Sequence, residues 1–401
     1  MMLFRSLLRR LILLVSDFWL ALPSFIEVHV LGAHRASETL HDSSQLTEQH
    51  DVAIVAMFQP RGLMPSTRRL LEAFRRRKVA VILVSNAPLP DVELDYLKSM
   101  TMVVLQRKNI GRDFGAYQCG LRFLANKNYE IEKLFLVNDS IYILPGIDNI
   151  IEKIQKAEDK YQGLTEIYEY HYHLASHFVA LDKTILEDEQ FKNFWNGYKP
   201  LSTRKHAIWK GEVGLTQALI NGAGIIPNVL FNANDLRAAL SGHSHAVKLQ
   251  DIFKLSPIPY ARDPNYMYLQ IRDLFIRLAS QGADSEPSAS ANQSESQPNC
   301  AKTNSQLAFV SEMVCEDVVS YGELRNQSHM FALLFVKYLQ YPVLKRDICQ
   351  RGVYEISTVV QFLSEYLSQS EVEAIEKDLR AKAYPVSVHG LRRFLFDNGR
   401  I

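Results

Sequence analysis

The sequence has few cysteines, almost no net charge and no glycine-rich dinucleotide fingerprint, and each absence narrows the class of protein. The four cysteines are scattered at positions 119, 300, 315 and 349 and form no CxxC or CxxH pair. This spacing favours reduced thiols in a cytoplasmic protein. The net charge of +1 gives no overall field that would attract nucleic acid. The missing GxGxxG sequence argues against a nucleotide-binding oxidoreductase.

The length of 401 residues suits one large domain with shorter appendages. Apolar residues make up 47% and charged residues 22%, as in ordinary soluble globular proteins. The stretch 281–305 differs, because it has few large apolar residues and many Ser, Asn, Gln and Glu. It cannot bury enough surface to offset the entropy of ordering. We therefore expect an N-terminal segment at 1–50, a main domain at 51–280, a disordered linker at 281–306 and a helical region at 307–401.

Apolar runs and helical patterns alternate through the main domain. Continuous apolar runs that indicate strands begin at Val52, Val79, Met102 and Leu134, and helical spacing follows the first of them at 67–77. This alternation is typical of a parallel sheet with helices on both faces. We predict an α/β fold with a mostly parallel sheet. Further strands are expected at 163–167 and 177–181, and further helices at 331–344, 357–367 and 371–382.

The segment 109–117, Asn-Ile-Gly-Arg-Asp-Phe-Gly-Ala-Tyr, lies between the third strand and a helix. Gly111 lets the backbone turn sharply and approach a ligand closely. Arg112 supplies a forked cation, and the start of the helix offers free N–H groups to an anion. Asp113 either points to the ligand or holds the loop, and Asn109 is expected to brace the turn.

A second segment, 134–140, is an apolar strand that runs into Asn138, Asp139 and Ser140. Open α/β sheets bind ligands and metals at the carboxyl ends of their strands. Asp139 suits a divalent cation such as Mg²⁺ or Mn²⁺, which prefers carboxylate oxygens completed by phosphate and water. The alternative is that Asp139 only caps the turn. Together the two segments predict a nucleotide-diphosphate site.

The pattern N-x-G-R-D-F-G-A-Y, followed by an apolar strand and Asn-Asp-Ser, resembles the rhamnan synthesis F family of polysaccharide-biosynthesis proteins. The resemblance covers residues 52–245 and resumes in the tail at 354–401. It implies a GT-A-like nucleotide-sugar domain, with a C-terminal helical region, in a glycosyltransferase. Other GT-A enzymes carry Asp-x-Asp at the acidic turn, whereas this chain has the single carboxylate of Asp139. That departure puts a metal requirement in question.

The expected site combines this resemblance with positions at strand ends. Phe58 and Asn86 follow the first two strands, where the nucleoside base would lie. Glu212 resembles the acidic helix start that supplies the catalytic base in inverting GT-A enzymes, although an ordinary first-turn glutamate would look the same. Lys210 could reach phosphate, and His245 is a candidate metal ligand beside Asp139. The predicted nucleotide-sugar-binding residues are Phe58, Asn86, Asn109, Gly111, Arg112, Asp113, Asn138 and Lys210, and the predicted catalytic residues are Glu212 and Asp139.

The N-terminal stretch 1–22 combines three arginines with an apolar run that Asp17 interrupts. The interruption leaves the run short for a spanning helix, and no small-x-small cleavage site follows it. We expect an amphipathic helix lying on the inner membrane surface, which makes the protein cytoplasmic and peripheral to the inner membrane. The alternative is a helix packed on the main domain.

These observations predict a glycosyltransferase that moves a hexosyl or deoxyhexosyl group from a nucleotide-sugar donor. The acceptor would be a glycan or lipid-linked glycan of a cell-surface polysaccharide or lipopolysaccharide, rhamnan-like by the resemblance. The alternative is a non-catalytic protein that keeps the GT-A-like shell and binds nucleotide sugars without turnover. The reduced acidic turn at 138–140 supports that alternative.

Overall fold

The computed structural model describes residues 2–32, 39–42, 50–127, 129–263, 265, 297–382 and 389–398. An 8-stranded sheet forms its centre, with the order β1-β4-β3-β2-β5-β10-β7-β11. The strands β4 (Val103–Gln106), β3 (Val79–Ser85), β2 (Asp51–Met57) and β5 (Lys133–Asn138) pair in parallel. The predicted α/β fold with a mostly parallel sheet flanked by helices is therefore confirmed.

Shorter strands complete the sheet on both sides of this parallel centre. β10 (Phe178–Asp182) pairs antiparallel with β5, and β7 (Tyr161–Gly163) pairs antiparallel with β10. The edge strands are β11 (Asn228–Val229), parallel to β7, and β1 (Thr39–Asp42), antiparallel to β4. The strand expected at 163–167 is divided between β7 and β8 (Glu166–Ile167), and β8 pairs with β9 (His173–Leu174).

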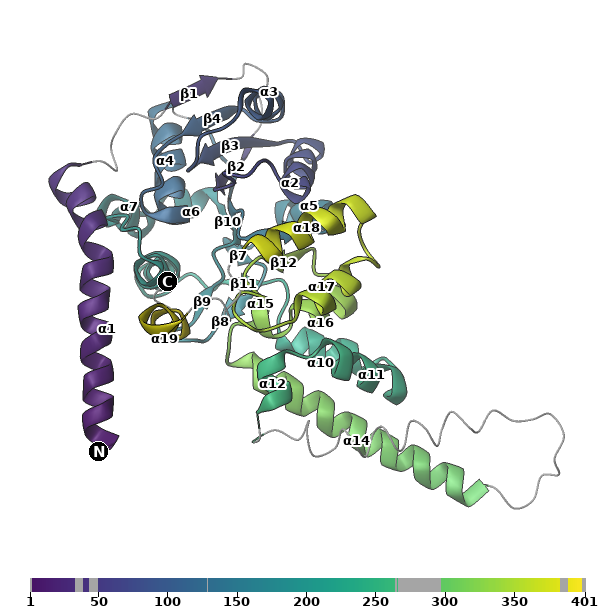
Figure 1. Ribbon diagram of the computed structural model, residues 1–401. Coiled ribbons are helices and arrows are strands. Elements are labelled where there is room, and N and C mark those ends of the chain that lie inside the picture. Colours follow the sequence, from purple (N-terminus) through teal and green to yellow (C-terminus); the bar gives the residue numbers. More distant parts are fainter. Residues whose placement is uncertain are drawn as a thin grey trace.

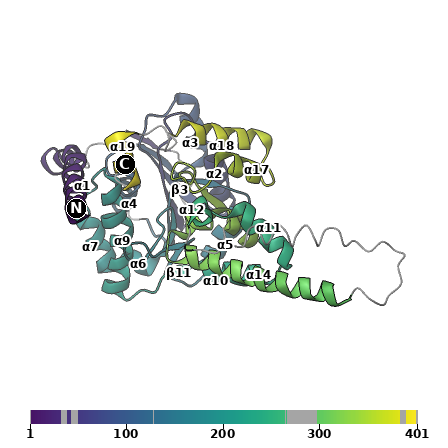
Figure 2. The same ribbon diagram turned by 60° about the horizontal axis from the view of Figure 1, so that its bottom comes forward.

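Alternate residues of each central strand enter different cores on the two faces of the sheet. In β2, Ala53 and Val55 join one apolar cluster, and Val52 and Ile54 join the other. The first cluster lies under α2 (Pro65–Arg76), α3 (Asp91–Met100) and α5 (Ile147–Lys156), and the second lies under α4 (Arg112–Lys127) and α7 (Glu189–Gly197). Figure 2 shows these two helical layers with the sheet between them.

The segment from Arg204 to Gly222 is helical throughout. It consists of α8 (Arg204–His206), η3 (Ala207–Glu212), α9 (Val213–Gln217) and η4 (Ala218–Gly222), where η marks wider π-helical turns. Such turns are often found at functional sites. After α6 (Lys183–Glu187) and α7, this segment brings its one carboxylate, Glu212, back to the strand ends.

The C-terminal part is helical, as predicted, but it does not form a core of its own. Its helices are α14 (Gln297–Glu323), α15 (Gln327–Met330), α16 (Ala332–Leu339), α17 (Ile356–Leu363), α18 (Gln369–Ala381) and α19 (Gly390–Asp397). Buried residues of α14, α16, α17 and α18 belong to the same cluster as α2 and α5. Buried residues of α10 (Ala233–Ser241), α11 (His245–Leu255) and α12 (Ile258–Arg262) also belong to this cluster, and Figure 1 shows these helices near α14.

The structure corrects the sequence prediction at three places in this part. The helix expected at 331–344 ends at Leu339 and is followed by β12 (Val343–Lys345), which pairs antiparallel with β6 (Ile141–Ile143). The helix expected at 371–382 begins earlier, at Gln369, because Ser368 caps it through a capping box with Glu371. α14 begins at Gln297, inside the predicted linker, while residues 281–296 lie outside the described residues.

The N-terminal helix α1 (Met2–Phe25) continues into η1 (Ile26–Val30) and extends beyond the sheet and its helices in Figure 1. The stretch Ser6–Val30 contains an 18-residue window with a mean hydropathy of 1.8 and, by length and composition alone, could cross a membrane. The prediction that the apolar run is short for a membrane-spanning helix is therefore wrong, because the helix continues past Leu22. Its Asp17 forms an ion pair with Lys205 at 2.8 Å, which ties α1 to the domain.

Gly111 is expected to be intolerant of any side chain. Its φ is +76°, and an added Cβ would collide with Pro200, whose Cα would lie 2.9 Å away. Gly224 is a matched control, because its φ is +66° but nothing lies within 4 Å of its Cβ position. We expect Gly224→Ala to lower the free energy of unfolding by about 1–2 kcal/mol. Gly111→Ala should have the same cost and, because its Cβ would also overpack the turn, should lower the free energy of unfolding by about 1–3 kcal/mol more.

Urea denaturation of the two variants and the wild type measures both free energies. Equal losses for Gly111→Ala and Gly224→Ala would contradict the close approach of Pro200 to the turn.

Candidate functional site

A cavity of about 530 Å³ opens at the carboxyl ends of the parallel strands. One wall comes from Phe58 after β2, the start of α4 and the turn after β5. The other wall comes from the C-terminal part, with Lys345, Arg346 and Arg351 among its residues. Open α/β sheets bind ligands at this edge. The cavity is therefore the candidate donor site, and both halves of the chain build it.

The glycine turn is held by two hydrogen bonds to Ser202. The N–H of Gly111 donates to Oγ of Ser202 at 3.1 Å, and Nε of Arg112 donates to the carbonyl of Ser202 at 2.9 Å. Arg112 has a φ of +55°, which is uncommon for a residue with a side chain and often marks a functional site. Its side chain lines the cavity, as predicted for a phosphate or base contact.

Asp113 and Asn138 connect the two sequence motifs. Nδ2 of Asn138 donates to Oδ2 of Asp113 at 2.8 Å, and Oδ1 of Asp113 accepts the N–H of Phe114 at 3.1 Å. Burial and the nearby charge of Glu212 raise the pKa of Asp113 to about 6. Oδ1 of Asn138 accepts the N–H of Ser140 at 3.0 Å. Both predicted residues line the cavity, and their hydrogen bonds also order the turn.

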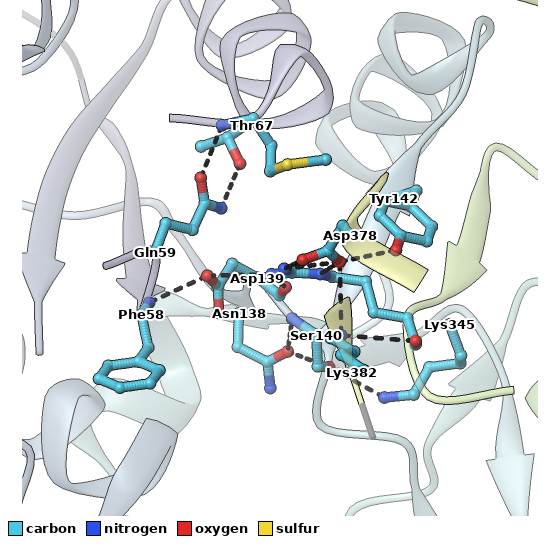
Figure 3. A network of polar contacts seen from close by, with 12 residues as sticks. Phe58, Gln59, Thr67, Asn138, Asp139, Ser140, Tyr142, Lys345, Asp378 and Lys382 are labelled. Carbon is cyan, nitrogen blue, oxygen red and sulfur yellow. Dashed lines mark hydrogen bonds and ion pairs between the residues drawn. The ribbon is translucent and has the colours of Figure 1, made fainter. Parts of the chain in front are cut away.

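Asp139 is engaged by a guanidinium group (Figure 3). Its Oδ2 accepts the N–H of Phe58 at 2.9 Å and lies 3.4 Å from Nη1 of Arg346, which also donates to its carbonyl at 2.8 Å. Nη2 of Arg346 contacts both carboxylate oxygens of Asp378 at 2.8 Å. Burial alone would lower the pKa of Arg346, but Asp378 and Asp139 raise it. The turn at Asp139 is thus part of an ion-pair network.

Glu212 lies in the cavity, but not at a helix start. It is the last residue of η3 and is followed directly by α9, so its expected position at a helix start is wrong. Ser176 Oγ donates to its Oε1 at 2.8 Å, and Nε2 of His173 lies 3.5 Å from its Oε2. Burial alone would raise the pKa of Glu212, but His173 and Lys345 hold it below its ordinary value. The carboxylate is therefore held in its ionised form.

Several other predicted residues lie elsewhere. Asn86 does not line the cavity, because its amide donates to the carbonyl of Arg112 at 3.1 Å and accepts from Arg107 at 3.0 Å. Asn109 is exposed and outside the cavity lining. Lys210 lines a separate small cavity beside α1, so its predicted phosphate contact is wrong for this structure.

His245 is at the first position of α11, where Nδ1 lies 3.2 Å from Oγ of Ser311 on α14. α11 packs beside α14 in Figure 1, and His245 is not among the residues that line the cavity with Asp139. The prediction that His245 joins Asp139 as a metal ligand is therefore wrong. Among the described residues, no group of three or more His, Cys, Asp or Glu side chains could hold a metal ion. With Arg346 paired to its single carboxylate, the turn does not fit a divalent cation.

The sequence reasoning missed the residues that the C-terminal part contributes. Lys345 is the last residue of β12, Arg346 and Asp347 follow it directly, and Lys382 follows α18. Burial and the charge of Arg346 lower the pKa of Lys382 to about 8. A run of Lys-Arg-Asp after an apolar segment is the only signal in the sequence, and it has no fixed spacing from Asp139. The contact depends on the pairing of β12 with β6.

Comparison with known proteins agrees with the sequence motifs. Residues 81–256 match the sequence model of the family described as rhamnan synthesis protein F. This confirms the resemblance over most of 52–245, whereas the resemblance of the tail at 354–401 lies outside the match and stays a prediction. The second wall of the cavity also lies outside the matched segment.

Two relatives share 25% identity with the chain. One is the uncharacterized protein y4gN of Sinorhizobium fredii, matched over 208 residues, 51% of this chain and 54% of that protein. The other is virulence protein VirA of Vibrio anguillarum, matched over 207 residues, 51% of this chain and 64% of that protein. The match thus spans little more than half of these relatives.

Solved structures with some likeness include two glycosyltransferases. GlyE of Streptococcus pneumoniae is 11% identical, with a TM-score of 0.28, and the match covers 52% of this chain and 51% of GlyE. The mannosyltransferase PcManGT of Pyrobaculum calidifontis, in complex with GDP-Man and Mn²⁺, is 12% identical, with a TM-score of 0.31. That match covers 81% of this chain and 98% of PcManGT. Such low scores add nothing to the fold assignment, which depends on the sheet topology.

Asp113→Asn tests the electrostatics of the site through its pH dependence. The raised pKa means that the native state holds this proton more tightly than the unfolded chain. The resulting stability is present in acid and is lost as the pH rises through about 6. We therefore expect the stability of the variant relative to the wild type to increase by about 1–3 kcal/mol between about pH 4 and pH 7.

Urea denaturation across this pH range measures the difference. Asp91→Asn, at an exposed carboxylate in the first turn of α3, is the control and should show no such change. A pH-independent difference for Asp113→Asn would contradict the position of Asp113 beside Glu212.

Proposed function

We propose that the protein is a glycosyltransferase that moves a sugar from a nucleotide-sugar donor onto a cell-surface polysaccharide or lipopolysaccharide chain. The observation that carries the proposal is a cavity lined by cations at the strand ends of a GT-A-like sheet. The match of residues 81–256 to rhamnan synthesis protein F supports it. That family name suggests a rhamnan-like product and a hexosyl or deoxyhexosyl donor.

The residues of the cavity suit the steps of such a transfer. Arg112 and the basic residues of the opposite wall can neutralise a departing nucleoside diphosphate. Phe58, whose side chain is 47% exposed, offers a ring face to the base. Glu212 can accept the proton of the acceptor hydroxyl as that oxygen attacks the anomeric carbon of the donor. The nucleoside diphosphate then leaves with the electron pair of the broken bond.

A donor screen tests the proposal. The protein is incubated with UDP-, GDP- and dTDP-sugars and an acceptor glycan preparation, and nucleotide release and glycan extension are measured. Extension of the glycan with one donor supports the transferase. Tight nucleotide binding without hydrolysis or transfer would support the non-catalytic alternative, which the single carboxylate of the turn at 138–140 favours.

Glu212→Gln separates binding from chemistry. The amide keeps the shape and can keep the contact with Ser176, but it cannot accept a proton. We expect transfer to fall by about 10²–10⁴-fold, with a donor dissociation constant within a few-fold of the wild type. The control is Glu189→Gln in the first turn of α7, outside the cavity lining. Transfer at the wild-type rate would remove Glu212 as the base.

We further propose that α1 binds the inner membrane surface, which makes the protein cytoplasmic and membrane-associated. Large apolar side chains stay exposed along it, such as Leu11 (58%), Leu14 (66%) and Phe18 (60%). Asp17 and the pair it forms with Lys205 keep one side of the helix on the domain. An exposed apolar helix of this kind favours the lipid interface.

The double substitution Leu11→Glu and Leu14→Glu should release the protein from vesicles of phosphatidylethanolamine and phosphatidylglycerol in a sedimentation assay. Two charges on the apolar face oppose its burial in lipid. Val92→Glu is the control, because Val92 is 84% exposed on α3, away from α1. Sedimentation of the double variant with vesicles as for wild type would contradict the proposal.

A further inference from the structure

The turn that bears metal ligands in many GT-A enzymes is here covered by basic side chains of the C-terminal part. Arg346 contacts the carbonyl and Oδ2 of Asp139 with one Nη atom. Its Nε donates to Asp378 at 3.0 Å, and Tyr142 donates to the same carboxylate at 2.7 Å. The guanidinium is therefore fixed at the place where a cation would have to meet Asp139.

Two lysines lie on either side of this guanidinium. Nζ of Lys345 donates to Oγ of Ser140 at 2.9 Å, directly at the turn. Nζ of Lys382 lies 3.4 Å from the carbonyl of Arg346 and 3.6 Å from Asp378. Each ammonium has three donors, so both can contact a phosphate while they keep these contacts. Lys345, Arg346 and Lys382 form the basic cluster, and all line the cavity.

The acidic residues around the cluster are already engaged. Asp139 and Asp378 contact Arg346, and Asp347 lies 2.9 Å from Nε2 of His329. Burial would raise the pKa of Asp347, but His329 and Lys345 hold it well below its ordinary value. A divalent cation at Asp139 would have to displace an arginine that is held by a second carboxylate, and it would lie beside two lysines.

We propose that the basic cluster takes the place of a divalent metal ion, and that the protein binds the diphosphate of its donor without metal. Lys345 and Lys382 contact the phosphate oxygens, while Arg346 neutralises Asp139 and keeps that carboxylate from repelling the phosphates. This inference rests on the proposed function, and it makes the C-terminal part a component of the donor site. The proposal also accounts for the single carboxylate of the turn, because a site without a metal ion needs no second carboxylate ligand.

The experiment measures the binding of UDP, GDP and dTDP to the full chain by calorimetry, in EDTA and in Mn²⁺. We expect one of these nucleotides to bind, and its dissociation constant should change less than about two-fold between the two conditions. Lys345→Gln and Lys382→Gln should each raise that constant by about ten-fold or more, as loss of one charge-assisted contact does. Lys377→Gln on the exposed side of α18 is the matched control and should have no effect.

The outcomes separate this inference from the proposed function. Binding that needs Mn²⁺ would overturn the inference and leave the glycosyltransferase proposal standing. Metal-independent binding that neither lysine variant weakens would also overturn it, by moving the phosphates elsewhere in the cavity. If no nucleotide and no inorganic pyrophosphate binds in either condition, both proposals fail.

Discussion

The contact of Arg346 with Asp139 and Asp378 is the interaction on which the architecture of the site depends. It joins the turn after β5 to the segment after β12 and to α18. Both of these lie more than 200 residues beyond that turn in the sequence. Its side chains are only 10–15% exposed. Removing one partner of such a buried pair typically costs about 3–5 kcal/mol, because a charge is left without compensation. The pair therefore fixes how the C-terminal part closes the cavity.

Because the C-terminal part closes the cavity, the candidate site includes residues outside the segment that matches the family model. Residues 81–256 supply the glycine turn, Asp139 and Glu212, whereas the basic cluster comes from residues 345–382. The pairing of β12 with β6 and the shared apolar core under α2 and α5 place the two walls together. A segment cut to the matched region would therefore lose the second wall of the candidate site and part of the core.

Two neighbouring carboxylates of the cavity, Asp113 and Glu212, differ in pKa although both are half-buried. Asp113 has a raised pKa because burial and Glu212 oppose its charge. Glu212 has a lowered pKa because His173, Lys345 and Ser176 outweigh its burial. Environments that push neighbouring pKa values apart are typical of acid–base sites. Glu212 is thus the stronger acid of the two, while Asp113 also braces the turn through its hydrogen bond with Asn138.

The sequence by itself determined the parallel sheet and the first wall of the site, because local signals carry both. Apolar runs at Val52, Val79, Met102 and Leu134 predict the central strands, and Arg112 and Asp139 lie where glycine turns and strand ends place them. Tertiary structure alone decided which residues form the second wall and which of the other predicted site residues reach the cavity. Strand pairing and helix packing bring Lys345 and Lys382 to the cavity and take Lys210 and His245 away from it. Such long-range contacts leave no periodic signal in the sequence, because they depend on the packing of segments whose separation along the chain is not fixed.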